Sequence, residues 1–295
     1  MFGATLRRWV PASLKARLSE RAKARLRALL RLEPWPDLAV RHPLFRTAAY
    51  RALRREAAPF DVEKPNKPIL ERGHQTAYLV ARWFAQAGMT TAFHVGYASG
   101  RYLFYLSRMG LGGGGTDLPP PDTAWVDVPI GVLDAATRRR MLRVDFFELD
   151  AKTLRSLWPE RGAFAVDVLF SEATFETMLP WRCGGASVPK YLAMPADALQ
   201  ALLSERLPAT VAELSSGVRN LIFIEPEPRA GGTGHVFEAC HRRLPELDYG
   251  VWEFRAPFDR LFRLSPSDPT RQTVYAFTRD ALLRETLTAY ARPVG

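Results

Sequence analysis

The residues with the clearest chemical pattern lie in the stretch AFHVGYASGRYLFYLSRMGLGGGGTDLP, residues 92–119. Gly96 and Gly100 follow an apolar run, where glycine lets the backbone approach a ligand closely and the helix after it directs free N–H groups at that ligand. Asp117 comes 17 residues after Gly100. A carboxylate there can accept hydrogen bonds from both hydroxyls of a ribose. The spacing therefore predicts that the turn and the acid face one slot.

Further polar residues follow later apolar runs. Asp150 ends FFELD, where we expect it to reach an adenine amino group, and Ser171 and Glu172 lie in LFSEATFE. Parallel α/β sheets bind ligands beyond the carboxyl ends of their strands, so these side chains are expected to face the same crevice.

The elements that must position these residues alternate between strand and helix. We expect a doubly wound, mostly parallel Rossmann-like sheet with an antiparallel hairpin at its edge. The seven expected strands cover residues 90–95, 111–117, 142–150, 165–171, 220–227, 249–256 and 272–279. The second is weak, because glycine is disfavoured in strands, and a tight loop that delivers Asp117 is the alternative. The expected helices cover residues 71–87, 100–109, 131–141, 151–158 and 196–215.

The basic charge is concentrated at the N-terminus. Residues 1–56 hold 14 Lys and Arg against 4 Asp and Glu, and the rest of the chain is neutral. We therefore predict a basic helical arm over residues 1–60 and a Rossmann-like domain over residues 61–295, joined at DVEKPNKPIL. Within residues 4–33, apolar residues recur at helical spacing. This helix either packs on the body or on a second subunit, as in a homodimer, or lies on an anionic membrane surface with its basic side chains snorkelling.

Composition excludes several classes of protein. No apolar run reaches the roughly 18 residues that span a bilayer, and Cys183 and Cys240 show no metal-ligand spacing. The expectation is a cytoplasmic protein without a metal, peripheral at the inner face of the membrane if the arm binds lipid. A neutral body argues against a nucleic-acid partner.

The order of these motifs resembles that of the class I S-adenosylmethionine-dependent methyltransferases. In that family an acid is followed by Gly-x-Gly-x-Gly and by a second acid about 17 residues later; here Gly96, Ala98 and Gly100 fall on the glycine positions and Asp117 on the acid. VDFFELDA, AVDVLFSEATFETM and NLIFIEPE resemble the third, fourth and fifth strands of the family. The resemblance covers roughly residues 72–280. His94 replaces the acid that helps to hold the methionine end of the cofactor, and Ala98 costs little if its φ is negative.

The resemblance implies an S-adenosylmethionine-dependent methyltransferase with this cofactor-binding set: His94, Gly96, Ala98, Gly100, Asp117, Asp150 and Ser171. The expected acceptor is a hydroxyl on a small molecule or sugar, with a lipid-linked acceptor as an extension. Transfer to oxygen needs a base, for which we favour His235 in a glycine-rich loop and Glu172; His74, Glu176 and Glu225 are further candidates. Methyltransferases that act on the amino groups of adenine or cytosine carry an Asn/Asp-Pro-Pro-aromatic motif after the fourth strand. This sequence has SEAT at that place, which argues against an amino-group acceptor of that kind. The alternatives are an NAD(P)-dependent oxidoreductase and a non-catalytic nucleotide-binding or scaffold module.

Overall fold

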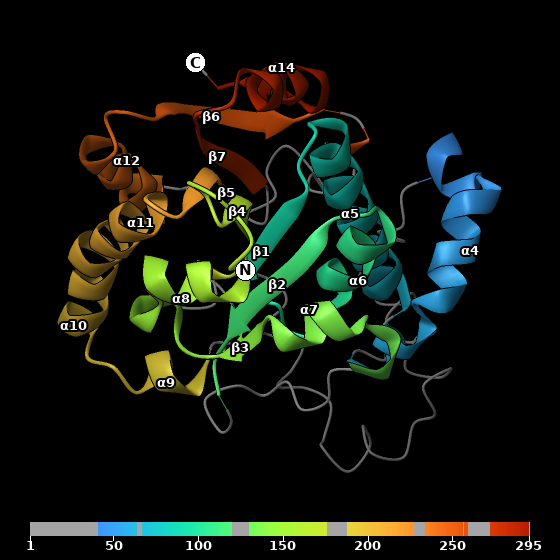
Figure 1. The fold of residues 1–295 in the computed structure, drawn as a ribbon, viewed down its shortest axis with the longest axis horizontal. Helices are drawn as coiled ribbons and strands as arrows, with labels where there is room; N and C mark the ends of the chain where they lie inside the picture. Colours follow the sequence, from blue (N-terminus) through green and yellow to red (C-terminus); the bar gives the residue numbers. More distant parts are fainter. Residues whose placement is uncertain are drawn as a thin grey trace, which may run out of the picture.

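A computed structural model describes residues 41–63, 67–119, 130–175, 188–226, 234–255, 257–258 and 272–294. These residues form an eight-stranded sheet with helices on both faces (Figure 1). The strands, in spatial order, are β3 (Met141–Arg143), β2 (Gly112–Asp117), β1 (Thr91–Val95), β4 (Val166–Glu172), β5 (Val218–Pro226), β7 (Gln272–Thr278), β6 (Asp248–Phe254) and β8 (Ala291–Pro293). The predicted helix over residues 4–33 lies outside the described residues.

The first five strands of this order are parallel, as predicted. From β1 the chain moves outward to β2 and β3 and then returns to β4 on the other side of β1, so the direction of winding reverses between β1 and β4. Ligands of doubly wound sheets bind beyond the carboxyl ends of the strands at such a reversal. Strand β7 is antiparallel to β5 and β6, and β8 adds an eighth strand outside the predicted hairpin.

Helices cover the two faces separately (Figure 1). On one side lie α5 (Lys67–Gln86), α6 (Arg101–Arg108) and α14 (Ala281–Tyr290), and on the other α8 (Ala151–Leu157), α10 (Ala196–Ala201), α11 (Leu207–Ser215) and α12 (Gly234–Arg243). The remaining helical segments are η1 (Pro43–Arg46), α4 (Ala48–Glu56), η2 (Ala58–Glu63), η3 (Ile130–Val132), α7 (Ala135–Arg139), η4 (Phe146–Glu148), α9 (Pro189–Leu192) and η6 (Leu202–Arg206). None of the described helices is both long and apolar enough to cross a bilayer.

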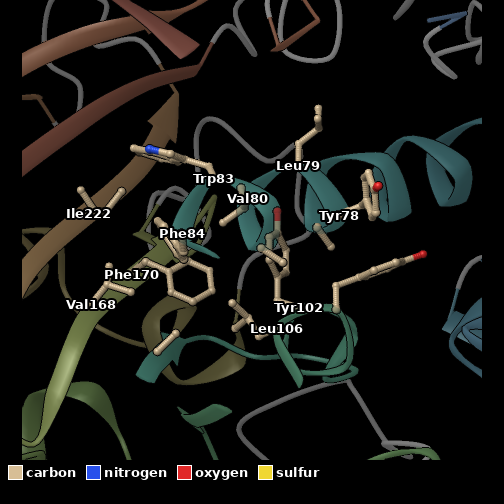
Figure 2. Packing of buried hydrophobic residues seen from close by; sticks show 14 of the residues in the cluster. Tyr78, Leu79, Val80, Trp83, Phe84, Tyr102, Leu106, Val168, Phe170 and Ile222 are labelled. Atoms are coloured by element: carbon tan, nitrogen blue, oxygen red, sulfur yellow. The ribbon is translucent and has the colours of Figure 1, made fainter. Parts of the chain in front are cut away.

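Each face has its own hydrophobic core. Helix α5 places Trp83 and Phe84 against Phe170 of β4 and Ile222 of β5 (Figure 2). The opposite core includes Phe237 of α12 and aromatic residues of the central strands. Burying a large apolar side chain contributes roughly 1.5–3 kcal/mol, so the two layers hold the sheet edge that carries the site in place.

The segment before α5 packs on the body. Tyr50 and Phe60 are buried in the same core as α5, and Phe60 contacts Phe104 of α6 with ring centroids 5.5 Å apart. Tyr50 Oη donates a hydrogen bond of 2.7 Å to Glu71 Oε1, and Arg54 Nε donates one of 2.8 Å to Glu71 Oε2. The boundary at residue 60 stays a prediction, but residues on its N-terminal side belong to this core.

The glycine run of β2 is a strand and not a loop. It pairs with β1 from Thr91↔Gly112 to Val95↔Thr116. A Cβ built on Gly114 would lie 2.7 Å from Trp158 Cη2 and 3.0 Å from Arg140 Cβ, closer than side-chain atoms approach. The Arg140 guanidinium in turn lies 4.9 Å from the centroid of the Trp158 ring. Because the side chains of Trp158 and Arg140 pack directly on the backbone of β2, a residue larger than glycine would not fit at Gly114.

Strand β3 is shorter than the predicted range of 142–150. Asp145 Oδ1 accepts a hydrogen bond of 3.0 Å from Phe147 N and so begins the 3-10 turn η4. Phe146 and Phe147 are buried through that turn, which explains why FFELD is apolar without being a strand.

Candidate active site

The turn after β1 depends on glycine. Gly96 has a φ of 72° and Gly100 a φ of 82°, in the left-handed region that favours glycine. A Cβ on Gly96 would lie 2.6 Å from Thr174 Oγ1, and that hydroxyl donates a hydrogen bond of 2.9 Å to the Val95 carbonyl. The turn is therefore packed against the loop that follows β4.

Ala98 departs from the prediction. Its φ is +46°, so the position that resembles the family's middle glycine keeps the glycine conformation. An L-residue in this region costs roughly 1–2 kcal/mol. Ala98 N donates a hydrogen bond of 2.7 Å to Asp117 Oδ2, which fixes the strained turn.

Asp117 lies beside the turn, as its spacing predicted. Its other oxygen, Oδ1, accepts a hydrogen bond of 2.8 Å from Leu118 N. A carboxylate has about four acceptor positions, so these two bonds leave capacity for hydroxyl donors. Burial raises the pKa of Asp117, although the Leu118 and Ala98 amides and the charge of Arg143 act to lower it.

Glu225, one of the further candidates for a base, is a buried carboxylate that organises the loop after β4. Glu225 of β5 is fully buried. Its Oε1 accepts hydrogen bonds from Ser171 Oγ at 2.9 Å, Thr174 N at 3.2 Å and Phe175 N at 3.3 Å. Within this loop Ala173 has a φ of +52°. Ser171 therefore supports the loop from inside the sheet.

Glu172 ends β4 at the same edge. Strand periodicity places it on the face of Phe170, which pairs in register with His94 of β1. Gln272 Nε2, at the start of β7, donates a hydrogen bond of 2.9 Å to Glu172 Oε1. Negative charge on Glu172 raises the pKa of Tyr102 further, after burial, which is the larger cause.

His94 is inside the protein. Its ring stacks on Phe170 at 4.4 Å and 6°, and Tyr102 lies 4.7 Å away on α6. Burial, assisted by the positive charge of Arg101, lowers the pKa of His94 to about 3, so the ring is neutral. Neither ring nitrogen has a hydrogen-bond partner among the described residues. Binding of the methionine end by His94 remains a prediction, but a neutral, covered imidazole offers no negative charge for it.

Asp150 is placed as a helix cap. Its Oδ1 accepts a hydrogen bond of 2.6 Å from Thr153 N at the start of α8. Asp145 is two residues beyond β3 and therefore nearer the strand's carboxyl end. It is buried, forms an ion pair with Lys190 and accepts hydrogen bonds of 3.2 Å from Tyr191 Oη. An adenine-side role for Asp150 stays a prediction.

The other predicted bases are placed differently. His235 belongs to the first turn of α12 and not to a loop, and its side chain is outside the described part of the structure. His74 is buried between Asp61 Oδ1 at 2.9 Å and Tyr105 Oη at 3.1 Å, so it is a core histidine. Glu176 lies outside the described residues. No group of metal-ligating side chains occurs among the residues that are described.

The residues at this edge fit an adenosyl ligand better than a phosphate ligand. Asp117 offers a carboxylate directly at the turn, which suits ribose hydroxyls and would repel a phosphate. Next to it lies the turn whose left-handed conformation depends on Gly96 and Gly100. This arrangement joins Gly96, Ala98, Gly100 and Asp117, while the Ser171 hydroxyl bonds to Glu225 and Asp150 caps α8; contact of Ser171 with the cofactor stays a prediction.

Comparison with known proteins gives likeness of fold. No protein-family model matches the chain, and no curated protein matches its sequence. Among solved structures, an O-methyltransferase from Bacillus cereus in complex with SAH shares 10% identity, with 86% of this chain and 96% of that chain covered and a TM-score of 0.41. Magnesium protoporphyrin IX methyltransferase from Synechocystis PCC 6803 shares 12%, covering 83% and 98%, with a TM-score of 0.40. A TehB-like SAM-dependent methyltransferase from Corynebacterium glutamicum shares 14%, covering 64% and 79%, with a TM-score of 0.38.

All three TM-scores are below 0.5, so the fold is established by the topology of the sheet and not by these likenesses. Five parallel strands reverse their winding between β1 and β4, antiparallel strands extend the sheet beyond β5, and helices cover both faces. The chain has a doubly wound, mostly parallel Rossmann-like fold.

Proposed function

We propose that the protein is an S-adenosylmethionine-dependent methyltransferase that acts on a hydroxyl of a small molecule or sugar. The observation that carries the proposal is the 2.7 Å hydrogen bond from Ala98 N to Asp117 Oδ2. This bond joins the turn after β1 to the acid at the end of β2, which supports a shared binding site at the edge where doubly wound sheets bind ligands.

The cofactor would supply an electrophilic methyl group, and the chain's residues would position it. Asp117 would accept the ribose hydroxyls, and the backbone from Gly96 to Gly100 would lie along the ligand. Asp145, or Asp150 as predicted from the sequence, would face the adenine. Because methyl transfer is an in-line displacement, a fixed turn matters more than any single polar contact.

An oxygen acceptor also requires a group that takes its proton. Glu172 ends β4 and His235 begins α12 after β5, so both follow strands whose carboxyl ends lie at this edge. We retain His235 and Glu172 as the candidates for a base. The acceptor would enter over these two strands.

Binding tests the proposal directly. Asp117→Ala should weaken binding of S-adenosylhomocysteine at least about tenfold, because buried hydrogen-bond partners are left unpaired, at a cost of about 1–3 kcal/mol. Glu160→Ala is the matched control: it removes an exposed carboxylate before β4 and should leave the affinity unchanged. Equal affinities of wild type and Asp117→Ala would contradict the role of Asp117. Thermal protection by NAD(P), with none by S-adenosylhomocysteine, would favour the oxidoreductase alternative.

We further propose that residues 4–33 contact an anionic membrane surface, in which case a lipid-linked acceptor becomes an option. The alternative is that these residues pack on a second subunit in a homodimer. The basis is the charge of the N-terminal segment. Pelleting with anionic liposomes, with and without residues 1–33, tests the contact. Equal pelleting of both forms would remove it, and sedimentation equilibrium of the same samples reports any dimer that depends on this segment.

A further inference from the structure

His94 leaves a chemical requirement unmet. In the methyltransferase family that the sequence resembles, an acid at this position helps to hold the methionine end of the cofactor, which carries an ammonium group. His94 is 2% exposed, lies between Phe170 and Tyr102, and is neutral. A neutral imidazole that is covered on its faces cannot supply the missing negative charge.

Other carboxylates at the same sheet edge are already engaged. Asp117 accepts from two backbone amides of the turn and of β2, and Asp145 is ion-paired with Lys190. Glu225 is fully buried and accepts three hydrogen bonds from β4 and the loop after it. Each of these carboxylates therefore has a structural partner that opposes a shift toward the cofactor's amino-acid end.

Glu172 has the position and the charge that the missing acid would need. Ser171 pairs in register with Val95, so Glu172 lies level with Gly96 at the start of the turn. It is on the face of His94 and Phe170, one step nearer the carboxyl edge. In the described part of the chain it contacts the neutral amide of Gln272 and has no ion-pair partner.

The surroundings of Glu172 complement an amino acid. Arg101 begins α6 with its guanidinium against the backbone of α5; a Cβ on Gly73 would lie 2.2 Å from Arg101 Nη1. The positive charges of Arg101 and Arg72 act on Tyr102, as does the negative charge of Glu172. Glu172 and Arg101 supply one negative and one positive charge, which match the opposite charges of an α-amino acid. Both His94 nitrogens are buried without hydrogen-bond partners among the described residues at the same place.

We propose that Glu172, and not the residue at position 94, recognises the ammonium group of the methyl donor. This inference rests on the proposed function and assigns the subsite that His94 leaves open. Proton removal from the acceptor then falls to His235, so Glu172 is a binding residue for the cofactor and not the base. Gln272 is a positioning residue that holds the Glu172 carboxylate at the edge of β4.

The test compares two ligands that differ in the amino-acid end. S-adenosylhomocysteine and 5′-methylthioadenosine share the adenosine and the sulfur, and the second lacks the amino acid. In calorimetric titrations of the full chain, Glu172→Gln should weaken S-adenosylhomocysteine about ten- to a hundredfold, the range expected for loss of a charged hydrogen bond. Binding of 5′-methylthioadenosine should change less than about twofold. Glu160→Gln, an exposed residue before β4, is the matched control and should change neither ligand.

A second comparison changes the ligand instead, and its first measurement needs only the wild-type protein. A deaminated analogue of S-adenosylhomocysteine, with hydrogen in place of the amino group, should lose as much affinity as Glu172→Gln does. The two changes together should cost little more than either one. This arm remains informative if the variant folds poorly.

The outcomes separate the inference from the proposed function. If wild type binds neither S-adenosylhomocysteine nor 5′-methylthioadenosine, both fail. If it binds both and Glu172→Gln changes neither, or weakens them equally, the assignment of Glu172 is overturned and the methyltransferase proposal stands. A deaminated analogue that binds wild type as tightly as S-adenosylhomocysteine overturns the assignment as well.

Discussion

Replacement of His94 by leucine should make the protein more resistant to acid. The folded protein keeps the imidazole neutral, with its pKa lowered to about 3 by burial and by Arg101, while the ordinary value of 6.5 applies to the unfolded chain. Between these values the unfolded state binds more protons than the folded state. Stability therefore falls as the pH is lowered from about 6.5 toward 3, and leucine removes this contribution.

The magnitude follows from the size of the shift. At pH 5 the unfolded histidine lies about 1.5 pH units below its pKa, which corresponds to ~2 kcal/mol of lost stability from this residue. At pH 7.5 the linkage vanishes. There the variant loses ring stacking on Phe170, roughly 0.5–1.5 kcal/mol, and is relieved of two buried unpaired nitrogens, so its stability should be close to that of wild type.

Urea unfolding at pH 7.5 and at pH 5 measures the difference. Wild type and His94→Leu both retain His74, whose pKa burial also lowers to about 3, so comparison of the two proteins isolates position 94. The free energy of unfolding of the variant should rise by ~2 kcal/mol relative to wild type between the two pH values. Parallel pH curves for the two proteins would refute a neutral, buried His94.

Three further changes test the packing around the site. Gly114→Ala should lower the free energy of unfolding by about 1–3 kcal/mol because its Cβ would lie 2.7 Å from Trp158. Gly113→Ala is the control: its Cβ would have no atom nearer than 3.5 Å, so the variant should be as stable as wild type or slightly more stable. Equal urea midpoints for the two variants would contradict this packing. Ala98→Gly should stabilise by up to about 1 kcal/mol at its φ of +46°, and a fall in the melting temperature would argue against strain. Glu225→Ala should cost more than about 2 kcal/mol by leaving three donors unpaired and should weaken cofactor binding, whereas unchanged binding would show that the loop holds without it.

The central strands could be predicted from the sequence because their apolar runs are buried on both faces. VDVLFS and NLIFIE fall within β4 and β5, and the spacing from Gly100 to Asp117 placed the acid beside the turn. These features depend on local pattern and on the topology of parallel sheets. They needed no knowledge of distant contacts.

Other features depend on contacts that local patterns do not record. The glycine strand β2 exists because Trp158 and Arg140 pack on its bare backbone. Likewise, FFELD ends β3 early because the Asp145 side chain bonds to Phe147 N and starts a turn.

Two helices were missed although the sequence carried a signal. In α12, Phe237 and Cys240 are buried at helical spacing, and Leu244, directly after the helix, continues the pattern. In α14, Leu283 and Leu287 are buried and Asp280 caps the start. The glycines around residue 232 favour a loop directly before α12. The strand-like run of residues 272–279 lies directly before α14. Glu225 and Glu172 could be named as candidates from the sequence, but the hydrogen-bond partners of each carboxylate depend on the three-dimensional arrangement.

Calorimetric titration of S-adenosylhomocysteine into the full-length protein tests the central claim most directly, because the claim is that the turn at Gly96 and the Asp117 carboxylate form one adenosyl slot. We predict saturable binding at one site per chain, weakened at least about tenfold in Asp117→Ala. Absence of binding to wild type, or equal affinity in the variant, would contradict it.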